Sequence, residues 1–286
     1  MSFLLLLFVT SFGNCICAQG ISGVRSFEDT SVRWPGKIVQ YRFGTDYKNT
    51  SDHNMIRAAN GSYCYPSTCI KFVDHTTENW AAILSLNVTT CLQFGVIVHE
   101  LMHVLGFLHE QSRPDRNNFI QVEWKNIHNW GRDQFYKYGK QGETCSACPK
   151  TTKQNLTTNE IKELNSCCDK NKVVSVFGGY DYGSIMHYEI KNGFGLKMDI
   201  DTMKSLKNVL PEVEIGQRTA MSPLDVEKVN EMYQCPSKEE KCITKSVSLR
   251  EAKATGHSFA LSAWDNTALL PDGEASVEKI RGIEES

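Results

Sequence analysis

Residues 99–109 read HELMHVLGFLH, a pattern that predicts a metal-binding helix followed by a sharp turn. A step of four residues places His99 and His103 on one face of a helix, one turn apart, which is the separation that two imidazoles need to bind one metal ion. Gly106 can adopt a positive φ, so the chain can turn back and present His109 as a third ligand. Three histidines leave a fourth position for water, as in catalytic zinc sites. We therefore predict one Zn²⁺ per chain.

The histidines lie within a longer apolar run, CLQFGVIVHELMHVL at residues 91–105, whose polar residues recur at helical spacing. The run is long enough for a central buried helix, and Gly106 ends it. A lone H-x-x-x-H pair is more often two buried core histidines than a metal site. Here Glu100, Gly106 and His109 stand at the offsets that a catalytic zinc site requires, so we favour the metal site.

The composition is that of an ordinary globular protein. The chain has 286 residues, of which 41% are hydrophobic and 22% charged, and its formal net charge is −2. These values exclude a disordered, collagen-like or multi-pass membrane protein, and the length suits one or two domains. No basic excess points to nucleic acid as a partner. The oligomeric state is left open.

The N-terminal residues have the features of a signal peptide. Residues 3–12 form an apolar run too short to span a bilayer, and a small alanine follows at position 18. We therefore predict a signal peptide over Met1–Ala18, no membrane span and a secreted protein; the alternative is an uncleaved segment at a membrane interface. Four glycosylation sequons fit an exported glycoprotein. They begin at Asn49, Asn60, Asn87 and Asn155.

Shorter patterns in the first half of the chain predict elements before the histidine helix. A Trp-Pro-Gly turn at residues 34–36 precedes alternating apolar positions that predict a strand up to Phe43. Residues 54–60 predict a helix that stops near Gly61, and Cys69–Val73 predicts a second strand.

The second half of the chain contains a polar segment, a turn and a late helix. Residues 139–172 are polar and cysteine-bearing, and we interpret them as an insertion or a long loop. Tyr180–Tyr188 is rich in glycine and aromatic residues and predicts a turn. Ser222–Tyr233 predicts a helix with a serine N-cap and a proline in its first position. From about Ser237 the composition predicts a loosely ordered tail.

The extended string HELMHVLGFLHEQSRPDR at His99–Arg116, together with SIMHY at Ser184–Tyr188, resembles the astacin family of metzincin zinc endopeptidases. The resemblance covers roughly Arg33–Cys235. It implies an α+β fold, a metzincin-type catalytic domain of two lobes. The N-terminal lobe is expected to hold a twisted sheet and the long zinc helix, and the irregular C-terminal lobe a late helix. We accordingly place the peptidase domain at residues 31–236 and the tail at 237–286.

The resemblance also implies roles for individual side chains. Glu100 matches the general base, and Tyr188 matches a tyrosine that can bind zinc at rest and then hydrogen-bond the transition state. Met186 matches a methionine beneath the metal, while His187 is expected to stay off it. Glu110 matches a glutamate that holds the buried ammonium of the mature N-terminus. The three matched zinc ligands are His99, His103 and His109.

Zinc chemistry supplies the mechanism that the resemblance implies. Zinc lowers the pKa of a bound water and polarises the scissile carbonyl, while Glu100 takes the water proton and later gives it to the leaving amine. The Tyr188 hydroxyl would help to stabilise the developing oxyanion. The sequence therefore predicts a secreted zinc endopeptidase that hydrolyses peptide bonds of extracellular proteins. The alternative is a secreted binding protein with a zinc site but a truncated, weakly active substrate cleft.

The cysteines predict disulfides in two places. Without the signal peptide nine cysteines remain, so at least one is unpaired or paired between chains. The resemblance implies a disulfide between Cys69 and Cys235. We expect two local disulfides among the cysteines of residues 139–172, rather than a second zinc site, because adjacent cysteines chelate poorly and the compartment is oxidising. These four are Cys145, Cys148, Cys167 and Cys168.

Two stretches depart from the family pattern. Only 29 residues separate Cys69 from His99, whereas the family also holds there a hairpin with its own cysteine and an edge strand along which the substrate lies. We therefore expect weaker binding of long peptides. Residues 19–30 form either a short pro-segment, in which Phe27-Glu28-Asp29 would approach the zinc, or, after cleavage at Arg25, the start of the mature enzyme.

Overall fold

The computed structural model of the chain describes residues 33–41, 43, 50–61, 67–74 and 92–236. All of them belong to the first of two units into which the chain divides, Met1–Pro236 and Ser237–Ser286. The predicted signal peptide, the segment 19–30 and the tail 237–286 lie outside the described residues. The shortened interval before the zinc helix, residues 75–91, lies outside them as well.

The N-terminal part of the described chain holds one parallel strand pair and one helix. Strand β1 (Ile38–Tyr41) follows a 3₁₀ turn at Pro35–Lys37 and pairs in parallel with β2 (Lys71–Asp74). Helix α1 (Thr50–Gly61) connects them in sequence and packs against helix α2. The predictions of strand, helix and strand are confirmed, but α1 begins before the predicted residue 54.

The second strand also begins later than the sequence predicted, at Lys71 rather than Cys69. The reason is local. The Thr68 hydroxyl accepts a hydrogen bond from the Ile70 backbone N–H at 3.1 Å, and the Cys69 N–H points to the sulfur of Cys235. Both donors are thereby withdrawn from strand pairing.

Helix α2 (Phe94–Val104) confirms the predicted buried helix, with a later start than residue 91. Its preceding residue, Gln93, has extended backbone angles. Gly95 allows a close approach to a distant segment, since a Cβ at this position would lie 1.6 Å from the carbonyl oxygen of Arg218. Ile97, Val98 and Met102 are among the fully buried residues of the core that surrounds α2.

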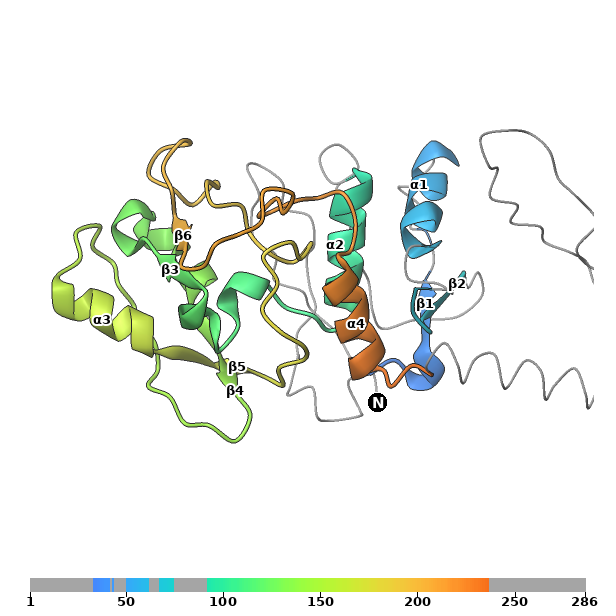
Figure 1. Cartoon of the computed structure of the whole chain (residues 1–286), viewed down its shortest axis with the longest axis horizontal. Coiled ribbons are helices and arrows are strands. Elements are labelled where there is room, and N and C mark those ends of the chain that lie inside the picture. Colours follow the sequence, from blue (N-terminus) through green and yellow to red (C-terminus); the bar gives the residue numbers. More distant parts are fainter. Residues whose placement is uncertain (1–32, 42, 44–49, 62–66, 75–91, 237–286) are drawn as a thin grey trace, which may run out of the picture. The chain divides into compact units, whose positions relative to one another are not determined.

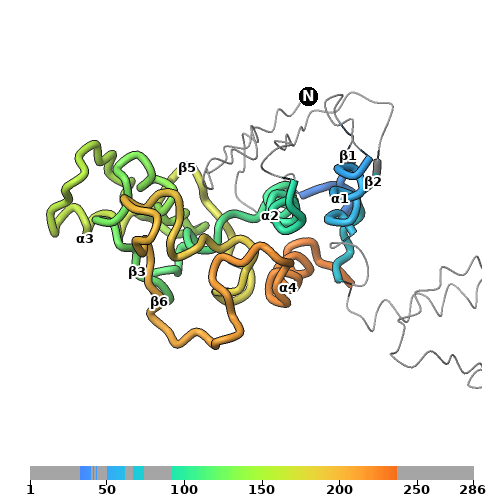
Figure 2. The backbone as a smooth tube through the Cα atoms, turned by 90° about the horizontal axis from the view of Figure 1, so that it is seen from above, coloured from blue at the N-terminus to red at the C-terminus, as the bar shows by residue number. Residues whose placement is uncertain are grey.

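Helix α4 (Pro223–Met232) lies beside α2, as Figures 1 and 2 both show, and contributes Val229 and Met232 to the same core. Its N-terminus has the predicted serine cap, extended to a full capping box by Asp225. The disulfide between Cys69 and Cys235, which the family resemblance implied, is present and ties the start of β2 to the end of α4.

A second hydrophobic core lies in the C-terminal part and is built from other elements. Strand β3 (Ile120–Val122) pairs antiparallel with β6 (Met203–Ser205), and β4 (Lys137–Lys140) pairs in parallel with β5 (Cys168–Val174). Helix α3 (Thr158–Ser166) adds the buried Leu164. Short 3₁₀ helices lie between α2 and β4, at Glu110–Ser112, Arg116–Asn118, Trp124–Asn126 and Asn129–Phe135.

Of the two interpretations of residues 139–172, the long loop is wrong, because α3 and the start of β5 lie within this segment, while the insertion stays a prediction. The polar composition suggested a loop, but a capping box begins α3. In it the Thr157 hydroxyl accepts from the N–H of Glu160, and the Glu160 carboxylate accepts from the N–H of Thr157. The expectation of two local disulfides is confirmed; they join Cys145 to Cys168 and Cys148 to Cys167.

No helix within the described ranges combines the length and the apolar character needed to cross a membrane.

Candidate metal centre

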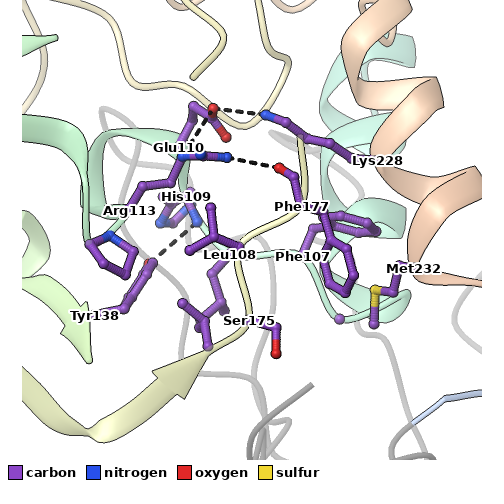
Figure 3. A pocket seen from close by; sticks show the side chains of 14 residues that line it. Phe107, Leu108, His109, Glu110, Arg113, Tyr138, Ser175, Phe177, Lys228 and Met232 are labelled. Carbon is purple, nitrogen blue, oxygen red and sulfur yellow. Dashed lines mark hydrogen bonds and ion pairs between the residues drawn. The ribbon is translucent and has the colours of Figure 1, made fainter. Parts of the chain in front are cut away.

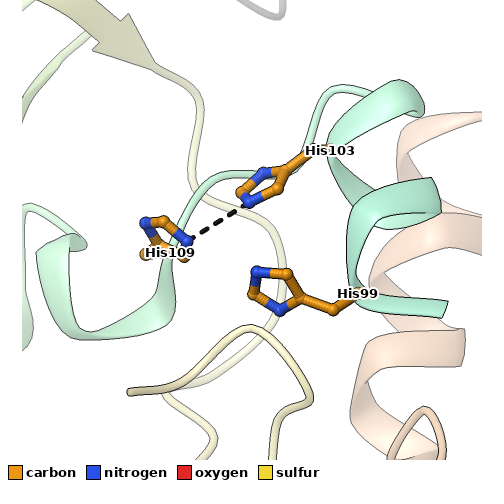
Figure 4. Close-up of side chains that lie close together, drawn as sticks. All are labelled: His99, His103 and His109. Atoms are coloured by element: carbon orange, nitrogen blue, oxygen red, sulfur yellow. Dashed lines mark hydrogen bonds between the residues drawn. The ribbon is translucent and has the colours of Figure 1, made fainter. Parts of the chain in front are cut away.

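The three predicted histidines come together at the C-terminal half of α2 (Figure 4). His99 and His103 project from the helix, and His109 returns toward them from the following loop, with its Nε2 3.2 Å from the Nε2 of His103. One ligand atom from each of the three lies within 4.8 Å of the others. This spacing suits three nitrogen ligands around one metal ion.

The turn that returns His109 is a Schellman motif centred on Gly106. Gly106 has φ of 101°, a conformation that favours glycine. Its N–H donates to the His103 carbonyl at 2.9 Å, and the Phe107 N–H donates to the Met102 carbonyl at 3.0 Å. The predicted sharp turn after the helix is confirmed.

The outer nitrogens of two histidines are held by backbone carbonyls. Nδ1 of His99 donates to the carbonyl of Ile185, and Nδ1 of His103 donates to that of Phe107, both at 2.7 Å. Because a carbonyl only accepts, each Nδ1 carries the proton and each Nε2 keeps its lone pair, as metal-binding imidazoles require.

Burial keeps all three imidazoles in the neutral, ligating form. It lowers the pKa of His103 to about 4, and it lowers the pKa values of His99 and His109 well below the ordinary value. Neutral nitrogen donors at this spacing, two of them with their outer nitrogens already bonded, fit a zinc ion.

Glu100 lies next to His99 on the helix and is also buried. Its Oε2 has no hydrogen-bond partner in the part of the chain that the structure describes. Burial raises the pKa of this carboxyl to about 7, although the positive charge of Arg218 opposes the shift. A buried carboxylate oxygen without a partner, on the helix that carries two of the imidazoles, can exchange a proton near neutral pH.

The predicted turn lies against the histidine cluster and carries Tyr188. This side chain is fully buried, and its ring centroid lies 4.6 Å from that of His109. Asp225 of α4 holds the middle of the turn, accepting from the Ser184 hydroxyl at 2.6 Å and from the Ile185 N–H at 2.9 Å. Gln111 holds the end, since its Oε1 accepts from the N–H of Tyr188 at 3.1 Å.

His187 is not a member of the metal-binding cluster, in line with the expectation. Its Nδ1 donates to the carbonyl of Tyr188, and its Nε2 accepts from the hydroxyl of Tyr180, both at 2.7 Å. Burial lowers the pKa of His187 to about 4, so the ring is neutral and fills this bridging role. The sequence did not single out the supports Asp225, Gln111 and Tyr180, because no local pattern connects them to their partners in the turn.

Glu110 has a partner that the sequence did not indicate. Its Oε1 accepts from the ammonium of Lys228 on α4 and from the backbone N–H of Asp181, both at 2.8 Å. A small pocket adjoins this pair, and His109, Phe107 and Phe177 also line it (Figure 3).

Comparison with known proteins identifies the family. The family model of Astacin, a family of peptidases, matches residues 78–149 and 150–234. The chain is 32% identical over 227 residues to zinc metalloproteinase nas-4 of Caenorhabditis elegans, covering 71% of this chain and 60% of that protein. It is 34% identical over 231 residues to zinc metalloproteinase nas-15 of the same organism, covering 74% of this chain and 34% of the relative. The chain belongs to the astacin family of peptidases.

A solved structure gives the same answer. High choriolytic enzyme 1, a hatching enzyme zinc-protease from the medaka Oryzias latipes, superposes with a TM-score of 0.52 and 27% sequence identity. The match covers 73% of this chain and 97% of that one. The predicted family, the α+β metzincin-type fold and a site for one zinc ion are thereby confirmed. The chain spans 60% of the length of the first nematode relative and 34% of the second.

Proposed function

We propose that the chain is a secreted zinc endopeptidase that hydrolyses peptide bonds of extracellular proteins. The observation that carries the proposal is the buried, unpartnered carboxylate oxygen of Glu100, on the same helix as His99 and His103 of the histidine cluster. A zinc site that serves only structure is usually closed by four protein ligands. Here three histidines form the cluster, and the helix that carries two of them also carries a buried acid whose pKa lies near neutrality.

Each side chain then has a defined task. His99, His103 and His109 hold the zinc, which when bound supplies a Lewis acid that acidifies water and polarises a carbonyl. Glu100 receives the water proton and later delivers it to the leaving amine, and a pKa near neutrality suits both directions of transfer. Tyr188 would be a further ligand of the zinc at rest, and its hydroxyl would donate a hydrogen bond to the developing oxyanion during the reaction.

Secretion is supported by the sulfur chemistry and by the N-terminal sequence. Three disulfides lie within the described residues, and such bonds persist in oxidising compartments. The apolar run within Met1–Ala18 supplies the export signal. Among the sequons, Asn155 is exposed whereas Asn60 is 5% exposed in α1, so we expect a glycan at Asn155 and none at Asn60.

The decisive experiment compares the wild-type protein with Glu100→Gln, an isosteric change that removes the base. We expect both proteins to hold zinc, while cleavage of an unfolded protein by the variant falls by about 10²–10⁴-fold, the range for losing a general base. Glu143→Gln is the matched control, because Glu143 is a surface carboxylate paired with Lys140. Equal and negligible cleavage by all three proteins, with zinc bound, would favour the alternative of a secreted binding protein.

A further inference from the structure

Glu110 connects the third histidine to two other parts of the metal centre. It directly follows His109, and its backbone N–H donates to the carbonyl of Met186 at 3.0 Å. Its carboxylate accepts from the N–H of Asp181 at the other end of the turn, and from Lys228 of α4 (Figure 3). Any displacement of this carboxylate would therefore be passed to the ligand loop and to the turn together.

Lys228 is a buried cation whose charge is matched by Glu110. The Lys228 and Glu110 side chains are only 4% and 6% exposed, and the ammonium nitrogen lies 2.8 Å from the carboxylate oxygen. Removing an ammonium from water is unfavourable unless a close opposite charge compensates it. The Nε of Arg113 lies 3.7 Å from Glu110, but the guanidinium donates its hydrogen bonds to Asp115 and to the carbonyls of residues 177 and 178.

The family resemblance implies another ammonium for this glutamate, and the residues that would supply it lie outside the described part of the chain. In the family the partner of the glutamate is the amino group of the mature N-terminus, which depends on where the chain is cut. Here a lysine 118 residues farther along the chain contacts the carboxylate. The aliphatic part of Lys228 also lies against Gly178, where a Cβ would be 3.2 Å from its Cγ, so the side chain is packed in place.

We propose that Lys228 is the ammonium partner of Glu110, and that this ion pair is a positioning pair that fixes His109 and the turn of Tyr188. The inference rests on the zinc centre of the proposed function, but its readouts do not require proteolysis. Lys228 and Glu110 act through His109 and the turn rather than on the substrate.

The test is the rate at which a chelator removes zinc from Lys228→Met, with the absorption spectrum of the Co²⁺-loaded protein as a measure of ligand geometry. Loss of a residue that orients a metal ligand weakens metal binding by about 10–100-fold. We expect zinc release at least about tenfold faster and an altered Co²⁺ spectrum, with Lys228→Arg close to wild type. If the protein cleaves peptides, kcat should fall while KM stays nearly constant.

A matched control separates positioning from general destabilisation. Arg132 is also a fully buried cation, but it donates to carbonyls of Lys153 and Gln154 in the second core. Arg132→Met should lower the unfolding midpoint and leave the Co²⁺ spectrum unchanged. Zinc release from Lys228→Met no faster than from Arg132→Met would overturn the proposal.

Two further measurements keep the proposal testable. If Lys228→Met does not fold, the double variant Glu110→Gln with Lys228→Met removes both charges and should fold; wild-type zinc release from it would overturn the positioning role. Wild-type chains that begin at Gln19 or at Ser26 should release zinc at equal rates. A tenfold difference between them would show that a terminal ammonium controls Glu110 instead of Lys228.

Discussion

The metal centre is built from two regions that are stabilised in different ways. The ligand segment, residues 99–109, is organised largely by its own hydrogen bonds, such as those from Gly106 to His103 and from Phe107 to Met102. The turn segment, residues 181–188, is held mainly by residues far away in sequence.

The supports of the turn segment show this dependence. Asp225 reaches Ser184 across 41 residues, and Gln111 reaches Tyr188 across 77. The metal ligands are therefore specified by local sequence, whereas the placement of Tyr188 depends on the packing of α4 and of the loop after His109. Substitutions in the two regions should accordingly have different effects.

The largest effect is expected from removing a ligand. His103→Gln leaves two imidazoles, so the protein should lose most of its zinc on dialysis against a weak chelator, and proteolysis should fall to background. His187→Gln, which removes a buried imidazole from the turn segment, should keep one zinc per chain. Metal analysis of the two variants tests whether the ligand segment alone holds the zinc. Equal zinc loss from both variants would contradict this difference between the two regions.

The next effect concerns the anchor of the turn segment. Asp225 is 1% exposed and accepts from Ser184, Ile185 and Ser222. Asp225→Ala should lower the free energy of unfolding by about 3 kcal/mol, because it leaves buried donors unpaired and breaks a capping box. It should also lower kcat while zinc stays bound.

Glu160→Ala provides the control for Asp225→Ala, because Glu160 has the same place in the capping box of α3 and its capping bonds are to Thr157, outside the turn segment. Its loss of stability should be smaller, with kcat unchanged. Urea unfolding and steady-state kinetics measure both quantities. A parallel fall in kcat for the two variants would mean that Asp225 acts through general stability.

The pH dependence of stability tests His187. Its pKa is about 4 in the folded protein, against 6.5 as the ordinary value. Below pH 6.5 the unfolded chain binds a proton that the folded protein does not, so stability falls as the pH falls toward 4. Between pH 7 and pH 5, zinc-free wild type should lose about 2 kcal/mol more stability than zinc-free His187→Gln. Equal losses of stability in the two proteins would mean that a group other than His187 binds the proton.

The smallest effect is expected within the ligand segment at Gly106, whose φ of 101° is strained for other residues. Gly106→Ala should cost about 1 kcal/mol of stability and weaken zinc binding, because it distorts the turn to His109. Gly142→Ala is the control, since Gly142 has φ of 77° and a Cβ there would meet no other atom of the described residues within 4 Å. Gly142→Ala should lower the free energy of unfolding by a similar amount but leave the zinc affinity unchanged. Titration of the zinc-free variants with metal measures that affinity.

The sequence could predict the features that depend on short-range pattern. The helix α2, the turn at Gly106, the return of His109 and the capped helix α4 all follow from residues within one or two helical turns of each other. The disulfide of Cys69 with Cys235 required the family resemblance, because its partners are 166 residues apart.

The features that the sequence could not predict depend on distant partners or on weak local signals. Helix α3 is polar and short, and only its capping box marks its start at Thr157. Lysine side chains are usually exposed to solvent, so the sequence does not indicate that Lys228 is buried. Only the fold brings it to Glu110. The same holds for Asp225, whose capping role is visible in sequence while its bonds to the turn are not.

The most direct test of the zinc-peptidase assignment is zinc analysis combined with proteolysis during removal and return of the metal. We predict one zinc per chain in the purified protein, loss of cleavage of an unfolded protein substrate when a chelator removes it, and recovery on addition of one equivalent of zinc. Cleavage that persists in zinc-free protein, or a protein with one zinc per chain that cleaves no faster than Glu100→Gln, would contradict the assignment.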